Sequence, residues 1–396
     1  MISVADAHHI LSQVAPLDDT ETIALSAAAD RILVAPIIAK RTQPPRDVSA
    51  MDGYAIDFAD IENGTESFAI IGEVAAGSLF DGTLKSGEAV RIFTGASLPD
   101  GANHIVIQED VTRAQDTITL TCRQDAPRHV RKAGQDFCAG DVLLGAGRRL
   151  SAADLALVAN GNHGTIDVTR RPRIAFVSSG DEIVAAGTAD SDTQIPDCNS
   201  AALQALVHDW GGECVARIIT PDDKPQFTAA VKALPAADII VPIGGASVGD
   251  YDYAKQVFYD LGYQAIFEKI AVKPGKPCWF ADNHENLVLG LPGNPSSALV
   301  TAHLFLRPLI ARLAGLEKTT DMLSGVLSAP LPANGWRENY LRGVWQINDA
   351  GQAEVEVAAK QDSALTGTFA AANCLVQCLP DAPERAAGDR VKFIAL

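Results

Sequence analysis

Three loops of this chain combine residue types that bind anions. One contains the glycine pair Gly244-Gly245. A second runs Lys269-Ile270-Ala271-Val272-Lys273-Pro274-Gly275-Lys276-Pro277, so three lysines stand among prolines and a glycine that restrict the backbone. The third runs Gly290-Leu291-Pro292-Gly293-Asn294-Pro295-Ser296-Ser297, in which Asn294 suits a helix N-cap and Pro295 the first helical position. Ammonium groups and the N–H groups of a helix start attract oxyanions, so the loops predict an anionic ligand.

Carboxylates stand beside these loops. Asp181-Glu182 follow a predicted strand at 174–177, and Asp250 and Asp252 follow another at 238–241. Oxygen ligands of this kind can hold a divalent cation against a phosphate. The alternatives are that Gly244-Gly245 only form a tight turn and that the lysines are solvated surface charges. The convergence of all these loops favours an anionic-ligand site with a bound divalent cation.

The elements that must position these loops alternate between strand and helix. Strands are predicted at 174–177, 215–219, 238–241, 265–270, 277–281 and 287–289, and helices at 200–209, 224–234, 251–261 and 295–313. Such alternation predicts a largely parallel sheet with crossover helices. Ligands of such sheets bind beyond the carboxyl ends of the strands, which is where the loops lie.

The flanking segments have a different pattern. Helices are predicted at 3–15, 20–30 and 151–160, and short strands broken by Gly, Asp and Pro occupy roughly 46–136. One domain is therefore interrupted by a β-rich insert. Short strands return at 324–396, as in a small terminal β-barrel or sandwich.

The composition and the motifs that are missing exclude several classes of function. The 396 residues carry a net charge of −17, which disfavours nucleic acid and anionic membranes as partners. The start lacks the pattern of a secretory signal and no apolar run is long enough to span a bilayer, so we expect a cytoplasmic protein. The seven cysteines include no C-x-x-C pair, which argues against a disulfide framework and a zinc knuckle, and Cys374 and Cys378 are expected to be structural. Neither dinucleotide nor P-loop glycine motifs occur.

Taken in order, the motifs resemble one family, the molybdopterin molybdenumtransferases, which include the MoeA proteins and the E domains of gephyrin and plant Cnx proteins. The matching segments are Ser49-Ala50-Met51-Asp52-Gly53-Tyr54-Ala55, Arg91-Ile92-Phe93-Thr94-Gly95-Ala96, Ser179-Gly180-Asp181-Glu182, Gly244-Gly245-Ala246-Ser247-Val248-Gly249, Lys273-Pro274-Gly275-Lys276-Pro277 and Leu291-Pro292-Gly293-Asn294-Pro295. Each motif is weak alone, but the ordered set is specific and spans nearly the whole chain.

The resemblance implies a multidomain α/β and β architecture and an elongated homodimer. Residues 1–45 with 137–170 would form a discontinuous linker and dimerisation domain, 46–136 an inserted β-rich domain, 171–318 a three-layer α/β molybdopterin-binding domain, and 319–396 a C-terminal β-barrel. The site would lie between the α/β domain of one subunit and the insert of its partner.

The resemblance also implies a reaction. The family transfers molybdenum from molybdate to adenylylated molybdopterin, with Mg²⁺, and releases AMP. The family's catalytic acids match Asp52, Asp136, Glu182, Asp222 or Asp223, and Asp252. Glu182 and Asp252 are the implied Mg²⁺ ligands. The implied substrate-binding residues are Ser247, Lys269, Lys273, Lys276 and Arg342, with Arg337 a further candidate, together with Gly244, Gly245, Pro292, Asn294, Pro295 and Ser363.

One segment departs from the family. Many relatives have a Ser-rich stretch where this chain reads Gln361-Asp362-Ser363, so Asp362 adds a negative charge near a predicted anion site. Two other functions remain alternatives: adenylylation of molybdopterin, and a non-catalytic cofactor carrier or scaffold. The resemblance further implies a molybdopterin adenylyltransferase and molybdenum-enzyme acceptors as protein partners.

Overall fold

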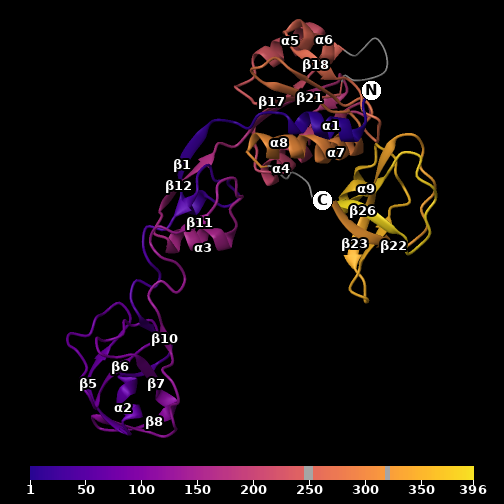
Figure 1. Ribbon diagram of the computed structural model, residues 1–396. Helices are drawn as coiled ribbons and strands as arrows, with labels where there is room; N and C mark the ends of the chain where they lie inside the picture. The colour runs from indigo at the N-terminus through magenta and orange to yellow at the C-terminus, as the bar shows by residue number, and fades with distance from the viewer. Residues whose placement is uncertain (245–252, 317–321) are drawn as a thin grey trace. The chain divides into compact units, whose positions relative to one another are not determined.

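The computed structural model describes residues 1–244, 253–316 and 322–396. These residues form two compact units (Figure 1). Unit 1 comprises residues 1–21, 30–34 and 167–396, and unit 2 comprises 22–29 and 35–166. Within the described residues, no helix is both long and apolar enough to cross a membrane.

Unit 1 contains a six-stranded sheet in the order β16-β13-β17-β21-β20-β18. The strands are β13 (Arg173–Ser179), β16 (Glu213–Thr220), β17 (Ile239–Ile243), β18 (Gln264–Phe267), β20 (Trp279–Asp282) and β21 (Leu287–Gly290). The first four in spatial order are parallel, whereas β20 and β18 run antiparallel to their neighbours. The prediction of a largely parallel sheet is confirmed.

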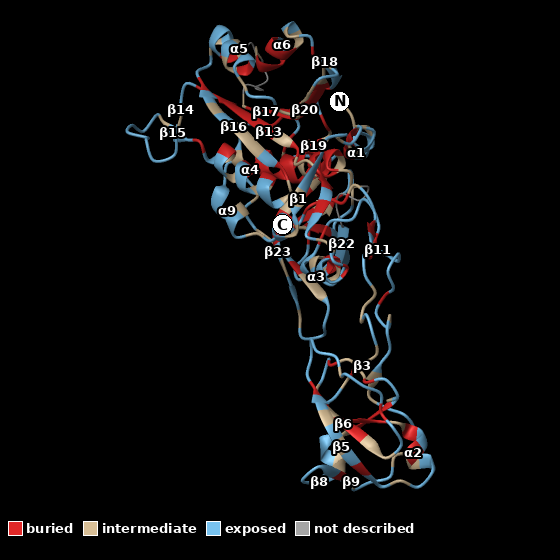
Figure 2. Cartoon of the chain, turned by 90° about the vertical axis from the view of Figure 1, so that its left-hand side faces the viewer, coloured by how far each residue is buried: buried red, intermediate tan, exposed pale blue. Residues whose placement is uncertain are grey.

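Helices cover both faces of this sheet (Figure 1). One face carries α5 (Lys224–Lys232) and α6 (Tyr253–Asp260), whose Phe227 and Phe258 share a core with Trp279. The other carries α1 (Val4–Ser12), α4 (Cys198–Asp209), α7 (Pro295–Thr301) and α8 (Arg307–Leu313). The central strands are almost wholly buried between these layers (Figure 2).

Two predicted helices differ from the structure. The expected helix at 295–313 is a continuous helical run, but a π-helical segment at Ala302–Leu306 separates α7 from α8. The helix expected at 20–30 was wrong: Thr20–Ala24 is strand β1, followed by a 3-10 turn at Leu25–Ala27. Thr20, Thr22 and Ile23 are β-branched, and such residues favour an extended backbone.

The C-terminal part of unit 1 is a closed five-stranded barrel, in the ring order β23-β24-β22-β26-β25. Its strands are β22 (Met322–Leu327), β23 (Glu338–Ile347), β24 (Ala353–Val357), β25 (Cys374–Cys378) and β26 (Arg390–Ala395), and α9 (Thr366–Ala370) precedes β25. Cys374 and Cys378 are buried on β25, as expected of structural cysteines. Tyr340, Leu375 and Ile394 join the core of the α/β layers, so barrel and sheet share one hydrophobic core.

Unit 2 contains a second six-stranded sheet, ordered β7-β4-β6-β5-β9-β8. Its strands are β4 (Gly53–Ile56), β5 (Ser67–Val74), β6 (Glu88–Ile92), β7 (His104–Ile107), β8 (Val111–Ala114) and β9 (Thr117–Leu120), with α2 at Phe58–Glu62. Two short pairs connect this sheet to the rest of the unit, β3 (Val48–Ser49) with β10 (Val130–Arg131) and β2 (Ile37–Ile38) with β11 (Val142–Leu144). The predicted helix at 151–160 is α3 (Ala152–Asn160), capped by Ser151.

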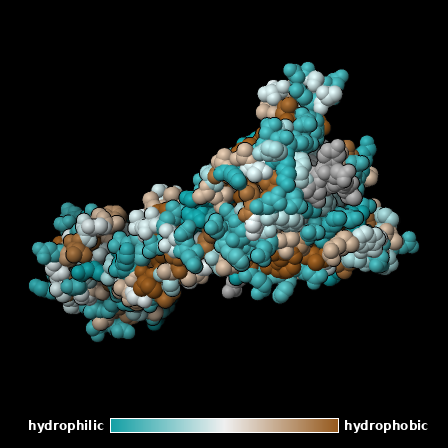
Figure 3. Space-filling model, turned by 90° about the horizontal axis from the view of Figure 1, so that it is seen from above, coloured by the Kyte–Doolittle hydropathy of each residue, from teal (hydrophilic) through white to brown (hydrophobic). Residues whose placement is uncertain are grey.

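The surface agrees with the acidic composition. Hydrophilic residues predominate on the face drawn in Figure 3, and hydrophobic ones form scattered clusters. A chain with net charge −17 repels anions over most of its surface, so an anion site requires a local concentration of cations.

Candidate functional site

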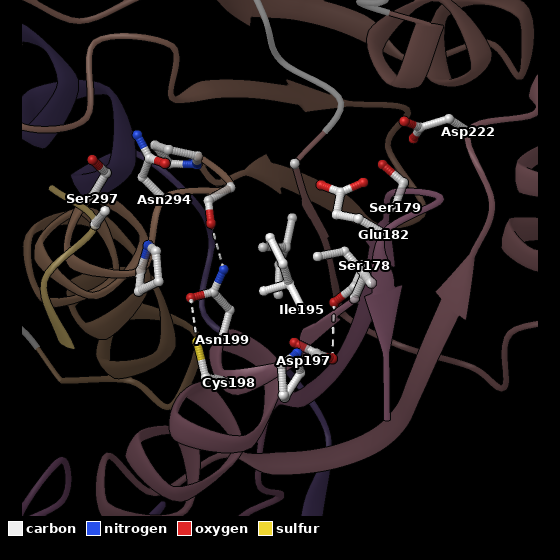
Figure 4. Close-up of a pocket in the computed structure, with 18 of the residues that line it drawn as sticks. Ser178, Ser179, Glu182, Ile195, Asp197, Cys198, Asn199, Asp222, Asn294 and Ser297 are labelled. Atoms are coloured by element: carbon white, nitrogen blue, oxygen red, sulfur yellow. Dashed lines mark hydrogen bonds between the residues drawn. The ribbon is translucent and has the colours of Figure 1, made fainter. Parts of the chain in front are cut away.

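A cavity of about 690 Å³ in unit 1 lies beyond the carboxyl ends of β13 and β17. Its charged lining residues are Glu182, Asp197 and Asp222, so we name it the acidic cavity. In Figure 4, Glu182, Ser179 and Asp222 lie on the side opposite Asn294 and Ser297. This is the sheet edge at which the sequence predicted a ligand.

Asp222 is held by two neighbours. Its main-chain N–H donates to Asp181 Oδ1 at 3.0 Å, and the hydroxyl of Tyr253 donates to Asp222 Oδ1 at 2.7 Å. Tyr253 packs edge-on against Phe227, with 5.7 Å between ring centroids. Burial, reinforced by the charge of Asp222, raises the pKa of Tyr253 well above its ordinary value. The phenol therefore stays protonated and keeps donating to the carboxylate.

The structure separates Asp222 from its neighbour. Asp223 is the N-cap of α5, and its Oδ1 accepts the main-chain N–H of Gln226 at 2.8 Å. Asp222 lines the cavity and Asp223 does not. Of the two acids that the sequence left open, Asp222 is the one placed to contact a ligand.

Asp197 lines the same cavity but has a structural role. Its side chain caps α4 by accepting the N–H of Ser200 at 3.0 Å, and it also accepts the hydroxyl of Ser178 at 3.2 Å. Asp197 is only 5% exposed, and both of its carboxylate oxygens already accept hydrogen bonds from α4 and β13. Among the described residues that line the cavity, Glu182 and Asp222 therefore carry the carboxylates available to a ligand.

Two further residues of the acidic cavity were not predicted as site residues. Ser179 is buried near the Tyr253 hydroxyl, and among the described residues its own hydroxyl has no partner with good hydrogen-bond geometry, so it can also bond to a ligand or water. Asn199 donates from Nδ2 to the carbonyl of Gly293 at 2.7 Å, which ties the start of α4 to the Pro-Gly-Asn-Pro loop. Asn199 and Gly293 are 94 positions apart, so no local pattern could reveal their contact.

A second cavity, of about 420 Å³, lies between the lysine loop and the barrel. Four cationic residues line it, Lys273, Lys276, Arg337 and Arg342, against the single acid Asp362, so we name it the cationic cavity. Pro277 and Ser297 line both cavities, which are therefore adjacent.

Two features position the lysine loop. Strand β19 (Val272–Lys273) pairs in parallel with β23 of the barrel, with Lys273 opposite Asn339. Gly275 has φ +117°, and a Cβ at that position would lie 2.2 Å from Cγ2 of Thr301. Only glycine fits there, so the Pro-Gly-Lys turn holds one conformation against α7.

Arg342 is the most deeply buried cation of the cationic cavity, with 1% exposure. Its Nη2 donates to the carbonyl of Asp362 at 3.0 Å, whereas its buried Nε has no hydrogen-bond partner among the described residues. Burial lowers the pKa of Arg342, although a guanidinium remains charged at neutral pH. A buried donor without an acceptor is costly, so this N–H would be stabilised by an anionic ligand in the cationic cavity.

Asn294 and Ser363, both predicted to bind substrate, contact each other between α7 and the barrel. Asn294 occupies the N-cap position of α7, but its side chain makes no capping bond and instead donates to Ser363 Oγ at 3.2 Å. The N–H of Ser296 donates to the carbonyl of Ser363 at 2.9 Å. The Asp362 carboxylate, which differs from the family pattern, accepts the N–H of Ala364 at 2.8 Å. It therefore stabilises a local turn.

The other predicted residues fall in several places. Gly244, Pro292 and Pro295 line the acidic cavity. Lys269 is exposed and lines neither cavity, although its carbonyl accepts the N–H of Ile2 at 3.0 Å.

Gly245, Ser247 and Asp252 lie outside the described residues. Within the described part of the chain, no group of three or more potential metal ligands occurs.

Two predicted acids belong to unit 2. Asp52 accepts the main-chain N–H and the hydroxyl of Thr94, both at 2.8 Å, and these bonds lower the pKa of its carboxyl. Asp136 lines a separate cavity of unit 2 with Arg41 and Arg131. They therefore belong to a different compact unit from Glu182 and Asp222.

Comparison with known proteins covers nearly the whole chain. Three family models match in order: the MoeA N-terminal region (domain I and II) at 2–161, a probable molybdopterin binding domain at 175–312, and the MoeA C-terminal region (domain IV) at 324–396. The molybdopterin molybdenumtransferase of Haemophilus influenzae is 35% identical over 376 residues, which cover 94% of this chain and 93% of that protein. The one from a Nostoc species is 36% identical over 363 residues, covering 88% and 83%.

A solved structure also matches along its whole length. The molybdopterin biosynthesis MoeA protein from Pyrococcus horikoshii superposes with a TM-score of 0.84 at 25% identity and covers 100% of both chains. This likeness and the three family matches confirm the predicted multidomain α/β and β fold class.

Proposed function

This chain belongs to the molybdopterin molybdenumtransferase family, and we propose that it inserts molybdenum from molybdate into adenylylated molybdopterin, hydrolysing the phosphoanhydride and releasing AMP. Membership confirms the prediction of a transferase that inserts molybdenum into molybdopterin to form the cofactor. The adenylylated substrate, the release of AMP and the use of Mg²⁺ are our proposals. The observation that carries the assignment of sites is the buried, unpartnered Nε of Arg342 in the cationic cavity.

We assign molybdate to the cationic cavity. Molybdate is a tetrahedral dianion, and guanidinium and ammonium groups are suited to bind its oxygens. Arg342 would donate its unpartnered N–H, and Lys273 and Lys276 would add charge from the rigid loop. Because Arg342 is screened from water, its interaction with an anion is stronger than that of an exposed cation.

We assign the pterin phosphate and its adenylyl group to the acidic cavity. Glu182 and Asp222 offer carboxylate oxygens, and Ser179 offers a hydroxyl oxygen. Mg²⁺ prefers oxygen ligands. Glu182, with Asp252, would hold the cation, which would neutralise the charge of the phosphoanhydride. Asp222, fixed by Tyr253, would orient the attacking water. Since Pro277 and Ser297 line both cavities, the two substrates would bind next to each other.

The decisive assay follows AMP release by purified protein supplied with adenylylated molybdopterin, Mg²⁺ and molybdate or tungstate. The proposal expects AMP and molybdenum cofactor to form together, and only when the oxyanion is present. Formation of adenylylated molybdopterin from ATP and molybdopterin would support an adenylyltransferase instead. Tight cofactor binding without turnover would support a carrier.

We also propose a homodimer in which the partner subunit contributes Asp52 and Asp136 to the site. Its support is that these acids belong to unit 2, whereas the cavities belong to unit 1. Mixing inactive Asp52→Asn subunits with Arg342→Ala subunits, which are nearly inactive at low molybdate, should restore about a quarter to a half of the activity, because half of the sites in a mixed dimer would be intact. Lack of recovery in mixed dimers verified by mass would contradict a shared site.

A further inference from the structure

The cationic cavity contains one acid that the assignments above leave without a role toward a ligand. Its charged lining residues are Asp362 and the cations Lys273, Lys276, Arg337 and Arg342. The negative charge of Asp362 partly offsets the effect of burial on the pKa of Arg342, so the carboxylate acts on the guanidinium. A carboxylate repels a bare anion, and it therefore favours a ligand that also carries a hydrogen-bond donor.

The hydrogen bonds of Asp362 leave one carboxylate oxygen open. Oδ1 accepts the N–H of Ala364 at 2.8 Å, and the main-chain carbonyl of Asp362 accepts Nη2 of Arg342 at 3.0 Å. Among the described residues, Oδ2 accepts no hydrogen bond. An ionised carboxylate has no proton to donate, so the open oxygen is an acceptor.

The segment that carries Asp362 is bonded to the backbone of Arg342. The N–H of Arg342 donates to Gln361 Oε1 at 3.0 Å. Gln361 Nε2 donates in turn to the carbonyl of Arg342 at 2.8 Å and to that of Ala358 at 2.7 Å. The guanidinium and the carboxylate are therefore held on segments that are fixed to each other, and a ligand that binds both groups orders little of the chain.

The cavity thus offers several donors and one acceptor. The buried Nε of Arg342 has no partner among the described residues, and Lys273 and Lys276 add ammonium groups. A tetrahedral oxyanion that keeps a hydroxyl group matches this set, because its oxygens accept from the cations and its hydroxyl donates to the carboxylate. Inorganic phosphate keeps at least one P–OH group throughout the neutral pH range, whereas sulfate and molybdate are fully deprotonated there.

We propose that Asp362 makes the cationic cavity selective for protonated oxyanions, and that inorganic phosphate binds there in competition with molybdate. Phosphate donates its hydroxyl to the carboxylate, whereas sulfate and molybdate place a bare oxygen against it. A site that bonds a ligand hydroxyl rejects analogues without one, and the unpaired like charge adds to the rejection. The competition rests on the proposed function, which places molybdate in this cavity, whereas the selectivity rests on the cavity alone.

The test is equilibrium binding of inorganic phosphate, sulfate and molybdate to the full-length protein by calorimetry at neutral pH. Wild type should bind phosphate at least about tenfold more tightly than sulfate. Asp362→Asn should tighten sulfate and molybdate about tenfold, because the amide donates a hydrogen bond where the carboxylate repels, and should change phosphate by less than about threefold. Asparagine can still accept the N–H of Ala364, so the turn is kept. Asp362→Ser, which is also neutral, should lose the preference for phosphate as well.

Asp389→Asn is the matched control. Asp389 is exposed beside β26 of the same barrel, its Oδ2 accepts the N–H of Ala386 at 2.8 Å, and it does not line the cationic cavity. Its substitution removes the same charge and should leave the preference for phosphate unchanged. Arg342→Ala should weaken the binding of all three oxyanions, which locates them in the cationic cavity.

Three outcomes would overturn the proposal: equal binding of phosphate and sulfate by wild type, an unchanged phosphate preference in folded Asp362→Asn, or unaltered phosphate binding by Arg342→Ala. In the assay of cofactor formation, phosphate should raise the half-saturating molybdate concentration of wild type more than sulfate does. The binding measurements involve no turnover. Loss of the phosphate preference therefore overturns the role of Asp362, whereas absence of AMP release in the assay above overturns the proposed function.

Discussion

The acidic and cationic cavities of unit 1 share two lining residues but are built in different ways. The acidic cavity takes its carboxylates from the ends of strands and the starts of helices within the α/β layers. The cationic cavity is formed by two parts of unit 1. The C-terminal part, which contains the barrel, contributes Arg337, Arg342 and Asp362, and the lysine loop contributes Lys273 and Lys276. Its strongest cation is buried, whereas Glu182 is exposed. Under the proposed assignments, a buried arginine would bind the oxyanion and exposed carboxylates would face the phosphoanhydride.

Arg342→Ala should produce the largest effect. Removing a buried charged donor costs about 2–3 kcal/mol of anion binding, or about 100-fold in activity at subsaturating molybdate. Cofactor formation measured against molybdate concentration checks this, and high molybdate should recover part of the rate. Arg385→Ala is the control, since Arg385 lies in the same barrel and its guanidinium donates to the carbonyl of Arg390, outside the cationic cavity. Undiminished activity at low molybdate would remove Arg342 from the oxyanion site.

Asp222→Asn should affect the other cavity. We expect kcat to fall about 30-fold while the half-saturating molybdate concentration stays unchanged, because the amide cannot take up a proton from water as a carboxylate does. Asp223→Asn is a closely matched control: asparagine also caps helices, so α5 should remain capped and activity should change little. Equal losses from both substitutions would contradict the separation of Asp222 from Asp223.

Lys276→Ala should have a smaller effect than Arg342→Ala, because Lys276 is exposed. An exposed charge contributes up to about 1 kcal/mol, so we expect about a fivefold loss at low molybdate. Salt distinguishes the two cations: the defect of Lys276→Ala should shrink at high ionic strength, whereas that of Arg342→Ala should persist. Lys392→Ala, an exposed lysine on β26, controls for the loss of one positive charge. If the defects of Lys276→Ala and Arg342→Ala depended equally on salt, the proposed difference between an exposed and a buried cation would be contradicted.

Tyr253→Phe should have the smallest effect. It removes only the hydrogen bond to Asp222, so we expect kcat to fall about threefold with no change in the molybdate requirement. Tyr259→Phe on the same helix is the control, because its hydroxyl donates to Glu268, away from both cavities. If Tyr253→Phe instead raised the half-saturating molybdate concentration, the two cavities would not act separately.

Local patterns made much of the fold predictable. The capping box of Ser151 and Asp154 starts α3 where expected, and the Asn294-Pro295 step starts α7. The alternation of strands and helices predicted a largely parallel sheet, and the carboxyl ends of its strands carry Glu182 and Gly244 at the acidic cavity. These signals depend on neighbours within a few positions, which is why they are visible in one chain. The same local rules misassigned 20–30, where β-branched residues favoured a strand.

The sequence by itself determined the loops and their chemistry: stiff Pro-Gly turns, lysines beside them, carboxylates at strand ends. Only the tertiary structure decided which of these groups meet. Pairing of β19 with β23 brings the lysine loop against the barrel, and the contact of Asn294 with Ser363 spans 69 positions. Burial of Arg342 and the capping role of Asp223 likewise became visible only once the chain was folded. The reason is physical, since desolvation and hydrogen-bond saturation depend on neighbours brought from distant parts of the chain.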